Sequence, residues 1–475
     1  MARPFVSVYR ANLYGRRNEK PCAFVSDSDC RVETFIFDAH IARAVKVAVI
    51  GLGYVGIPVA AALATNGVRV VGVDIDPAKV EAVSRGRCLL SGDEPGLEDL
   101  LSRAIQSKKL VATMDYDEVD GANAAIVSVE TPIDPVTKDP QYRALKTALR
   151  RLAPHLNRGA LVSIESTISP GTMASVVKPI LEKGSGMKVG RGLCLAHCPE
   201  RVTTGKLLHN LIKLDRVIGT EDATSRRKAL NLYGRFVEGT LHPTDWISAE
   251  ITKTAENAYR DVQIAFANEI ALICEELGAN AYRVRELVNT CPGRDVLLPG
   301  AGVGGHCIPK DPWLLVSPVI HQKPILIPSA REVNDYMPIR MAQLVEEAMR
   351  EAGRRIRGAQ VAILGFAYRE NTDDARNSPA IPLVRELRRR GADVTIHDPF
   401  ARSTHGFTVT RDLRTTLKGA DCLALVTAHD AYRRLDLKKV RRWMRHRAIV
   451  DGRNFFDGSV SKGGFVYRAI GKGEF

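Results

Sequence analysis

Short apolar runs alternate with segments of helical period from residue 45 onward. Runs of about four to eight apolar residues between turn signals are typical of buried strands in a parallel sheet, whose two faces are both covered by helices. In the first half of the chain we expect such strands at residues 45–50, 68–73, 124–129, 160–164 and 193–197. This alternation predicts an α/β domain over residues 45–235.

The period becomes helical after Trp246. Residues 247–277 contain no proline and are followed by Gly278, a residue type that commonly ends helices. A helix of about 30 residues is roughly 45 Å long, which suits a spine between two domains. A second helical segment and the glycine-rich loop 299–309 follow it, so we expect a central helical domain over residues 236–352.

Strand and helix alternate again near the C-terminus, with strands expected at residues 360–364, 393–397, 421–426 and 448–450. This unit, residues 353–475, repeats the first one: "KVAVIGLGYVG" leads to "VVGVDID", and "QVAILGFAYRE" leads to "VTIHDP". The second copy lacks the glycine pattern, so we do not expect it to bind a dinucleotide in the same way.

Composition narrows the class of protein. A chain of 475 residues with 45% hydrophobic and 26% charged residues fits a globular protein of several domains. The net charge of +14 favours anionic partners such as a diphosphate, but no aromatic-interleaved basic stretch indicates nucleic-acid binding. Nine cysteines without paired spacing predict reduced thiols, no metal site and a cytoplasmic location.

Two segments need separate interpretation. Residues 47–64 carry no charge and are long enough to span a membrane, but three glycines and Pro58 within them favour a strand, a turn and a helix, so no membrane contact is expected. Residues 1–44 lack the apolar core of a secretory signal and contain several acidic residues, unlike a transit peptide. We interpret them as a disordered extension or as an artefact of the assumed translation start.

The segment Gly51-Leu52-Gly53-Tyr54-Val55-Gly56 follows a predicted strand and opens a helix, the context in which GxGxxG indicates a dinucleotide site. Gly51 would permit the tight turn, Gly53 the approach of the pyrophosphate, and Gly56 the packing of helix on strand. Asp74, at the end of the next strand, would bind the ribose hydroxyls and disfavour a 2′-phosphate. We therefore expect Rossmann-like α/β domains, the first of which binds NAD rather than NADP.

A cysteine follows the second glycine-rich segment, which reads "GAGVGGHCIPKD" over residues 300–311. Glycines let a backbone wrap closely around a ligand, and loops often carry catalytic residues. Cys307 is thus a candidate nucleophile, with Lys310 lowering the pKa of its thiol and Asp311 acting as a base for water.

These motifs, in order across about residues 45–460, resemble the UDP-glucose/GDP-mannose dehydrogenase family. The resemblance implies an NAD-binding Rossmann domain, a helical dimerisation domain and a C-terminal Rossmann-like domain that binds a UDP-sugar. It implies oxidation of the sugar 6-hydroxyl to a carboxylate in two steps through a thioester on Cys307. It also implies a homodimer or a dimer of dimers, and a role in cell-surface polysaccharide biosynthesis.

The resemblance assigns the remaining catalytic roles residue by residue. Thr167 and Glu200 match the groups that position water for thioester hydrolysis. Lys253 and Asn257, four residues apart and so on one helix face, match the pair that stabilises the developing alkoxide. The family's second glutamate is Thr204 here, so its role is absent or moved.

Binding residues follow in the same way. Cofactor contacts are expected, beyond the glycines and Asp74, at Tyr54, Val55, Thr131, Lys310 and Arg376. Substrate contacts are expected at Arg201, Val202, Arg260, Arg294, Gly302, Gly304, Arg369 and Arg453. Among these, Arg453 would bind the diphosphate or the base, and Arg294 would reach the neighbouring subunit's site.

The segments "ENAYRD", "IAFANE" and "SAREVND" are most similar to the UDP-N-acetylmannosamine dehydrogenase branch of the family. Arg260 would recognise the N-acetyl carbonyl, or else form a structural ion pair near Asp261. N-acetylmannosamine is expected as the sugar before N-acetylglucosamine and glucose. The alternatives are a β-hydroxyacid or 6-phosphogluconate-type dehydrogenase, which needs no catalytic cysteine, and a catalytically silent regulatory protein that binds a nucleotide sugar.

Overall fold

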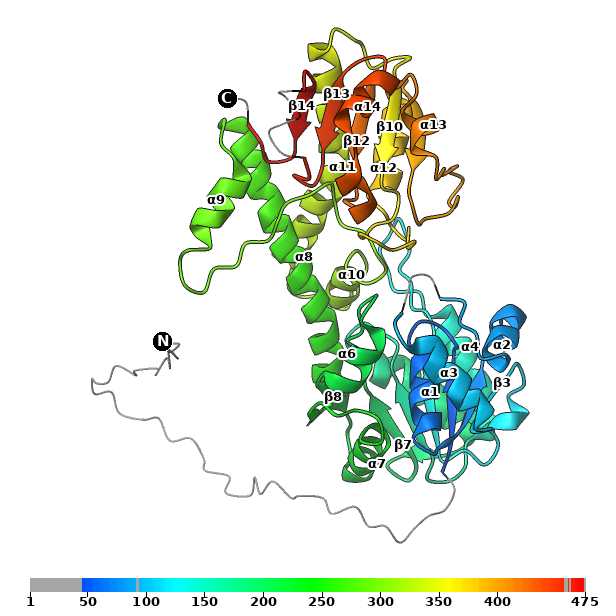
Figure 1. The fold of residues 1–475 in the computed structure, drawn as a ribbon. Helices are drawn as coiled ribbons and strands as arrows, with labels where there is room; N and C mark the ends of the chain where they lie inside the picture. The colour runs from blue at the N-terminus through cyan, green and yellow to red at the C-terminus, as the bar shows by residue number, and fades with distance from the viewer. Residues whose placement is uncertain (1–44, 91–93, 457–459, 461–462, 474–475) are drawn as a thin grey trace, which may run out of the picture. The chain divides into compact units, whose positions relative to one another are not determined.

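The computed structural model describes residues 45–90, 94–456, 460 and 463–473 (Figure 1). The expectation for residues 1–44 lies outside this part of the chain. Residues 47–64 form strand β1 (Lys46–Ile50), a glycine turn and helix α1 (Gly56–Thr65), as predicted. None of the described helices is long and apolar enough to cross a membrane.

The first sheet has the strand order β3-β2-β1-β4-β5-β7-β8-β9, with β6 paired to β7. Besides β1, its strands are β2 (Arg69–Val73), β3 (Leu110–Thr113), β4 (Ala124–Val127), β5 (Leu161–Ile164), β6 (Lys188–Val189), β7 (Gly192–His197), β8 (Arg216–Gly219) and β9 (Leu241–Thr244). The five strands expected from sequence are all present, and the pairings are parallel except that β8 runs antiparallel to β7.

Two hydrophobic cores cover the two faces of this sheet. In β1, Val47 and Val49 belong to one core, and Ala48 and Ile50 belong to the other, as alternation along a strand requires. The first core includes α1, α3 (Leu97–Gln106), α6 (Leu207–Lys213) and α7 (Ala223–Tyr233), and the second includes α4 (Arg143–Leu152) and α5 (Lys178–Ser185). The remaining helix of this region is α2 (Pro77–Ser84). The predicted doubly covered sheet is confirmed.

The long helix α8 (Trp246–Glu276) begins and ends within a residue of the prediction. Its N-cap, Asp245, accepts the Ser248 N–H at 2.7 Å, and Gly278 beyond its end has a φ of +70°. Helices α9 (Ala281–Val288), α10 (Asp311–Val316) and α11 (Leu326–Glu351) follow, and α11 packs along α8. The predicted helical domain contains α11, whose bounds were not predicted, and Pro338 lies inside this helix.

The second sheet is entirely parallel, in the order β11-β10-β12-β13-β14. Its strands are β10 (Gln360–Leu364), β11 (Asp393–His397), β12 (Cys422–Leu425), β13 (Ala448–Asp451) and β14 (Val466–Ala469). The core on one face includes α11 and α12 (Ala380–Arg389), and the core on the other includes α13 (Leu413–Leu417) and α14 (Leu437–Trp443). This order is that of a doubly wound nucleotide-binding fold.

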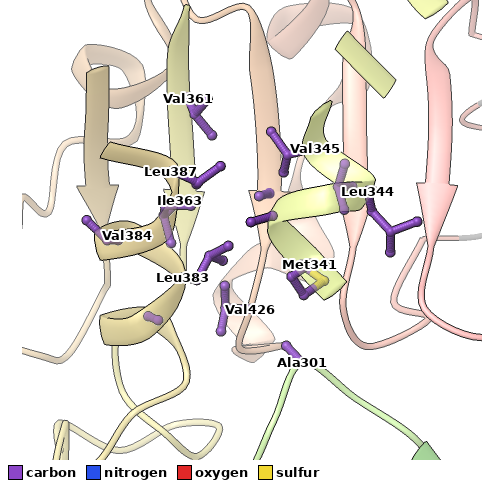
Figure 2. Packing of buried hydrophobic residues seen from close by; sticks show 14 of the residues in the cluster. Ala301, Met341, Leu344, Val345, Val361, Ile363, Leu383, Val384, Leu387 and Val426 are labelled. Atoms are coloured by element: carbon purple, nitrogen blue, oxygen red, sulfur yellow. The ribbon is translucent and has the colours of Figure 1, made fainter. Parts of the chain in front are cut away.

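The α11 face of this core also anchors the glycine-rich loop. Figure 2 shows Met341 and Val345 of α11 and Leu383 of α12 against the strands, with Ala301 at the edge of the cluster. Ala301 is 1% exposed. The segment that leads to Cys307 is therefore fixed to the core of the second sheet.

Candidate active site

The loop between β1 and α1 has the geometry expected of a pyrophosphate site. Gly51 has a φ of +97°, and a Cβ there would lie 2.3 Å from the Ser128 carbonyl oxygen. A Cβ on Gly56 would lie 1.8 Å from the carbonyl oxygen of Gly51, so only glycine allows this turn. A Cβ on Gly53, in contrast, would meet no atom within 4 Å, which leaves the space that a bound phosphate needs.

Two further features fit a dinucleotide. Tyr54 and Val55 lie at the N-terminus of α1, where N–H groups without helical partners favour an anion. Asp74 is 8% exposed and accepts the Leu52 N–H at 2.7 Å and the Asp76 N–H at 2.9 Å. These bonds fix its carboxylate beside the glycine loop, and each oxygen keeps a lone pair for a ribose hydroxyl.

One face of α8 joins the candidate catalytic groups. The Lys253 ammonium lies 3.5 Å from Glu200 Oε1, and the Asn257 amide donates to Asp311 Oδ2 at 2.6 Å. The Lys310 ammonium donates to the other Asp311 oxygen at 2.6 Å. Residues distant in sequence thus meet in one buried polar cluster.

Asp311 is fully buried, with one donor on each carboxylate oxygen. In this structure it orients Asn257 and Lys310 rather than facing open solvent. Lys310, expected both near the cofactor and as an activator of the thiol, is paired with this carboxylate.

Cys307 precedes α10, and its carbonyl accepts the N–H groups of Lys310 and Asp311 at 3.0 and 2.9 Å. Burial raises the pKa of its thiol to about 12, and the Asp311 and Glu200 carboxylates add to the increase. Lys310 lowers that pKa, as expected, but the net effect is an increase. The thiol of the free protein therefore has a raised pKa, although Lys310 lowers it.

Lys253 is held as a cation. Burial opposes its charge, but Glu200, the Cys307 sulfur and Asp311 together raise the pKa of its ammonium above the ordinary value. Glu200 in turn accepts the N–H of Val202 at 2.6 Å. A protonated lysine next to a thiol can stabilise negative charge that develops on a substrate oxygen.

Thr167 lies in the segment after β5 and is half-buried. Its carbonyl accepts from the Thr131 hydroxyl at 2.5 Å, which joins it to a residue expected at the cofactor. Two residues later, Ser169 donates to the Leu314 carbonyl of α10 at 2.7 Å. The Thr167 segment is thereby tied to the helix that follows Cys307.

The glycines of the cysteine loop make room for protein groups. A Cβ on Gly304 would lie 2.4 Å from Cβ of Tyr368, and one on Gly302 would lie 3.1 Å from the rings of Pro338 and Pro379. We expected close approach to a ligand at these positions. In the structure these positions lie close to α11 and to the second α/β unit, and the ligand contact stays a prediction.

A pocket of about 300 Å³ lies where this loop meets the second sheet. It is lined by Leu298, Pro299, Glu370, Ala428, Arg433, Arg453, Asn454 and Phe455. Arg453 donates to the Val426 carbonyl at 2.9 Å, and the Arg433 guanidinium lies over the Phe455 ring, 5.4 Å from its centroid. Two guanidinium groups and an aromatic ring suit a nucleoside diphosphate.

The other arginines expected at the substrate differ in their surroundings. Arg201 pairs with Glu256 of α8, Arg369 donates to the Thr204 carbonyl at 3.0 Å, and Arg376 pairs with Asp374 at 2.6 Å. Arg294 is exposed and donates to the nearby Pro292 carbonyl.

Arg260 is exposed on α8 and forms no ion pair with any described residue. Asp261, beside it, pairs with Arg331 instead, at 2.6 Å. The structural ion pair considered for Arg260 is thus not present in the described part of the chain.

Sequence comparison identifies the family to which the chain belongs. The NAD binding, central and UDP binding domains of the UDP-glucose/GDP-mannose dehydrogenase family match residues 45–237, 247–336 and 362–458. The chain is a member of this family. Its dinucleotide site is accordingly an NAD site, and the pocket beside Arg453 is lined in part by its UDP binding domain.

Relatives within the family support the assignment. The chain is 38% identical to a UDP-N-acetyl-D-mannosamine dehydrogenase of Pyrococcus horikoshii over 90% of its own length and 100% of the relative's. It superposes on the solved structure of that enzyme with a TM-score of 0.85. It is also 35% identical, over 86% of its length and 96% of the relative's, to an NDP-N-acetyl-D-galactosaminuronic acid dehydrogenase of Ralstonia nicotianae.

One cluster was not anticipated. Thr204 is buried, and its hydroxyl faces the phenols of Tyr54 and Tyr368. Tyr54 also donates to Glu94, whose carboxylate accepts the Gly205 N–H at 2.8 Å. Glu94 thus supplies a carboxylate next to Thr204. Nothing in the sequence around Glu94 predicted these contacts.

Proposed function

We propose that the protein oxidises the 6-hydroxyl of UDP-N-acetyl-D-mannosamine to a carboxylate, with NAD as oxidant, through a thioester on Cys307. The observation that carries this proposal is the buried cluster of Cys307 with Lys253, Glu200 and Asp311. The names of the P. horikoshii relative and its solved structure support the choice of sugar.

The Gly51–Gly56 loop would hold NAD, which would supply the hydride acceptor for both oxidations. In the first, the 6-hydroxyl gives its proton to water, a hydride leaves its carbon, and an aldehyde forms, while Lys253 and Asn257 stabilise the alkoxide charge. The Cys307 sulfur then adds to the aldehyde carbon, and the thiol proton passes to the oxygen, giving a thiohemiacetal. The second oxidation turns this into a thioester.

Hydrolysis completes the reaction. Water, positioned by Thr167, adds to the thioester carbon, the carbon–sulfur bond breaks, and the sulfur regains a proton. Glu200 accepts the proton that water loses, and Asp311 holds Asn257 and Lys310 in place. Covalent attachment keeps the aldehyde from escaping between the two oxidations.

We further propose a homodimer in which α8 of each subunit contacts the other. Tyr259, Phe266 and Ile273 are exposed, apolar and seven residues apart on this helix, so they form one stripe. Phe266→Asp should shift the mass measured by light scattering from dimer to monomer. We also place the reaction in the cytoplasm, since the described cysteines are all free thiols.

The decisive experiment counts NADH formed per sugar consumed. Purified protein receives NAD and, separately, UDP-N-acetylmannosamine, UDP-N-acetylglucosamine, UDP-N-acetylgalactosamine or UDP-glucose. Two NADH per UDP-N-acetylmannosamine, with little from the others, is the expected result. Two NADH per molecule of another UDP-sugar would identify that sugar as the substrate. One NADH per sugar would exclude the thioester. No NADH with any sugar would favour the alternative of a regulatory protein.

A further inference from the structure

Three side chains on one face of α8 each hold a different segment of the site. Lys253 holds the Glu200 segment and Asn257 holds the Cys307 segment through Asp311. Glu250, three residues before Lys253, holds the segment that contains Thr167. The first two contacts involve proposed catalytic residues, whereas Glu250 has no role in the scheme above.

The Glu250 contact is well formed. Its side chain is 1% exposed; Oε2 accepts the Gly171 N–H and Oε1 accepts the Met173 N–H, both at 2.7 Å. Burial raises the pKa of this carboxyl to about 7, and the two N–H donors oppose that effect. A buried carboxylate that is disfavoured by its surroundings costs folding free energy, which is common at functional sites.

The same segment is also held from the other side. Ser169 donates to the Leu314 carbonyl at 2.7 Å and its hydroxyl lies 2.9 Å from that of Ser317, just beyond α10. Residues 167–173 therefore lie between the helix that carries Lys253 and the helix that follows Cys307. Glu250 makes none of its hydrogen bonds to Cys307 or Lys253.

We propose that Glu250 is a positioning residue for thioester hydrolysis. By fixing the backbone at Gly171 and Met173, it sets where Thr167 holds the attacking water. In this step the water oxygen bonds to the thioester carbon, the carbon–sulfur bond breaks, and sulfur leaves with its electron pair and is reprotonated. The inference rests on the proposed function and extends it to a residue that does not touch the substrate.

Glu250→Gln tests this assignment with little change in shape. Glutamine keeps one acceptor oxygen and places an NH₂ group against an N–H donor, so one hydrogen bond to a charged group is lost. The two oxidations should remain, and hydrolysis should slow about ten- to a hundredfold. We expect a burst of two NADH per Cys307, a low steady-state rate, and a sugar-acyl adduct on Cys307 in acid-quenched protein analysed by mass spectrometry.

Glu276→Gln is the matched control, because Glu276 is an exposed glutamate at the end of the same helix. It should show neither burst nor adduct. If Glu250→Gln does not fold, Ser169→Ala loosens the same segment from α10 and should give the same adduct to a lesser extent.

An equal fall in the burst and steady-state rates without adduct, or unchanged kinetics, would overturn the role of Glu250. That result is distinct from failure of the proposed function, in which the unaltered protein forms no NADH with any UDP-sugar. The latter would overturn the inference as well.

Discussion

Alkylation by iodoacetamide should show that the Cys307 thiol is protonated in the free protein. Iodoacetamide reacts with thiolates, so the labelling rate reports the ionised fraction. Burial, Asp311 and Glu200 raise the pKa of this thiol to about 12. At pH 8 about one thiol in 10⁴ is then ionised, against about one in four for an ordinary thiol with a pKa near 8.5. Labelling should therefore be about a thousandfold slower.

Two substitutions should change this rate in opposite directions. Asp311 is the larger of the two carboxylate contributions to the increased pKa, so Asp311→Asn should speed labelling at pH 8. Lys253 lowers the pKa of the thiol, so Lys253→Met should slow labelling further. A change in accessibility alone would not produce opposite signs from two neighbours of the same sulfur.

The assay is peptide mapping of each cysteine against time between pH 7 and pH 10. Cys291 is exposed and serves as the internal reference in every sample. The Cys307 rate should rise about tenfold per pH unit across the whole range. Labelling of Cys307 as fast as Cys291 at pH 8, or a rate that levels off before pH 10, would refute the electrostatic reasoning.

Three further predictions follow from single contacts. Gly53→Ala should leave the thermal unfolding temperature unchanged, because the added Cβ meets no protein atom within 4 Å. It should raise the Kd for NAD, measured by calorimetry, at least tenfold. Unchanged affinity would show that the pyrophosphate does not bind at this turn. Asn268→Ala removes the side-chain oxygen that accepts the Gly300 N–H at 2.9 Å. The free energy of unfolding, measured with urea, should fall by about 1–3 kcal/mol, and a fall below about 0.5 kcal/mol would contradict this prediction. Arg453→Gln should raise KM for the UDP-sugar far more than it lowers kcat, and a selective fall in kcat would argue against a binding role.

The sequence predicted strands well where both faces of a strand are buried. The runs that became β1, β5, β10 and β12 are apolar and buried, and their positions were predicted within a residue. Strand β11 was predicted as well, although it lies at a sheet edge and is partly exposed. Among the strands that were missed, β9 reads "LHPT" with a proline, and β3 and β14 lie at sheet edges and are partly exposed. Strand β8 was also missed; it is mostly buried but short, "RVIG", and begins with an arginine. Their pairing depends on distant strands, which a local pattern does not contain.

The bounds of helix α11, unlike those of α8, were not predicted. Proline usually ends a helix, and Pro338 interrupts its pattern. In the structure the Pro338 ring packs against Gly302, where even a Cβ would lie 3.1 Å from it. The tertiary contact explains why proline is tolerated there, and it involves residues 36 positions apart (338 − 302).

The candidate catalytic residues were predictable because each lies in a short motif. The groups that hold them were not, since Glu250 bonds to backbone 77 and 79 residues away and Asn268 to backbone 32 residues away. The charge balance around Cys307 was also beyond local sequence. Lys310 suggested an activated thiol, but burial, and after it the Asp311 and Glu200 carboxylates, raise the pKa of the thiol by more than Lys310 lowers it.

That charge balance bears on how the proposed addition takes place. Lys253 faces Glu200 and Lys310 faces Asp311, so the charges around the thiol cancel in pairs while it is protonated. Ionising Cys307 alone would add an unpaired buried charge, which is why burial raises the pKa of its thiol so far. Adding the thiol to an aldehyde while its proton moves to the carbonyl oxygen leaves the total charge unchanged. The site therefore favours proton transfer during carbon–sulfur bond formation over attack by a free thiolate, and Lys253 stabilises the oxygen as the proton arrives.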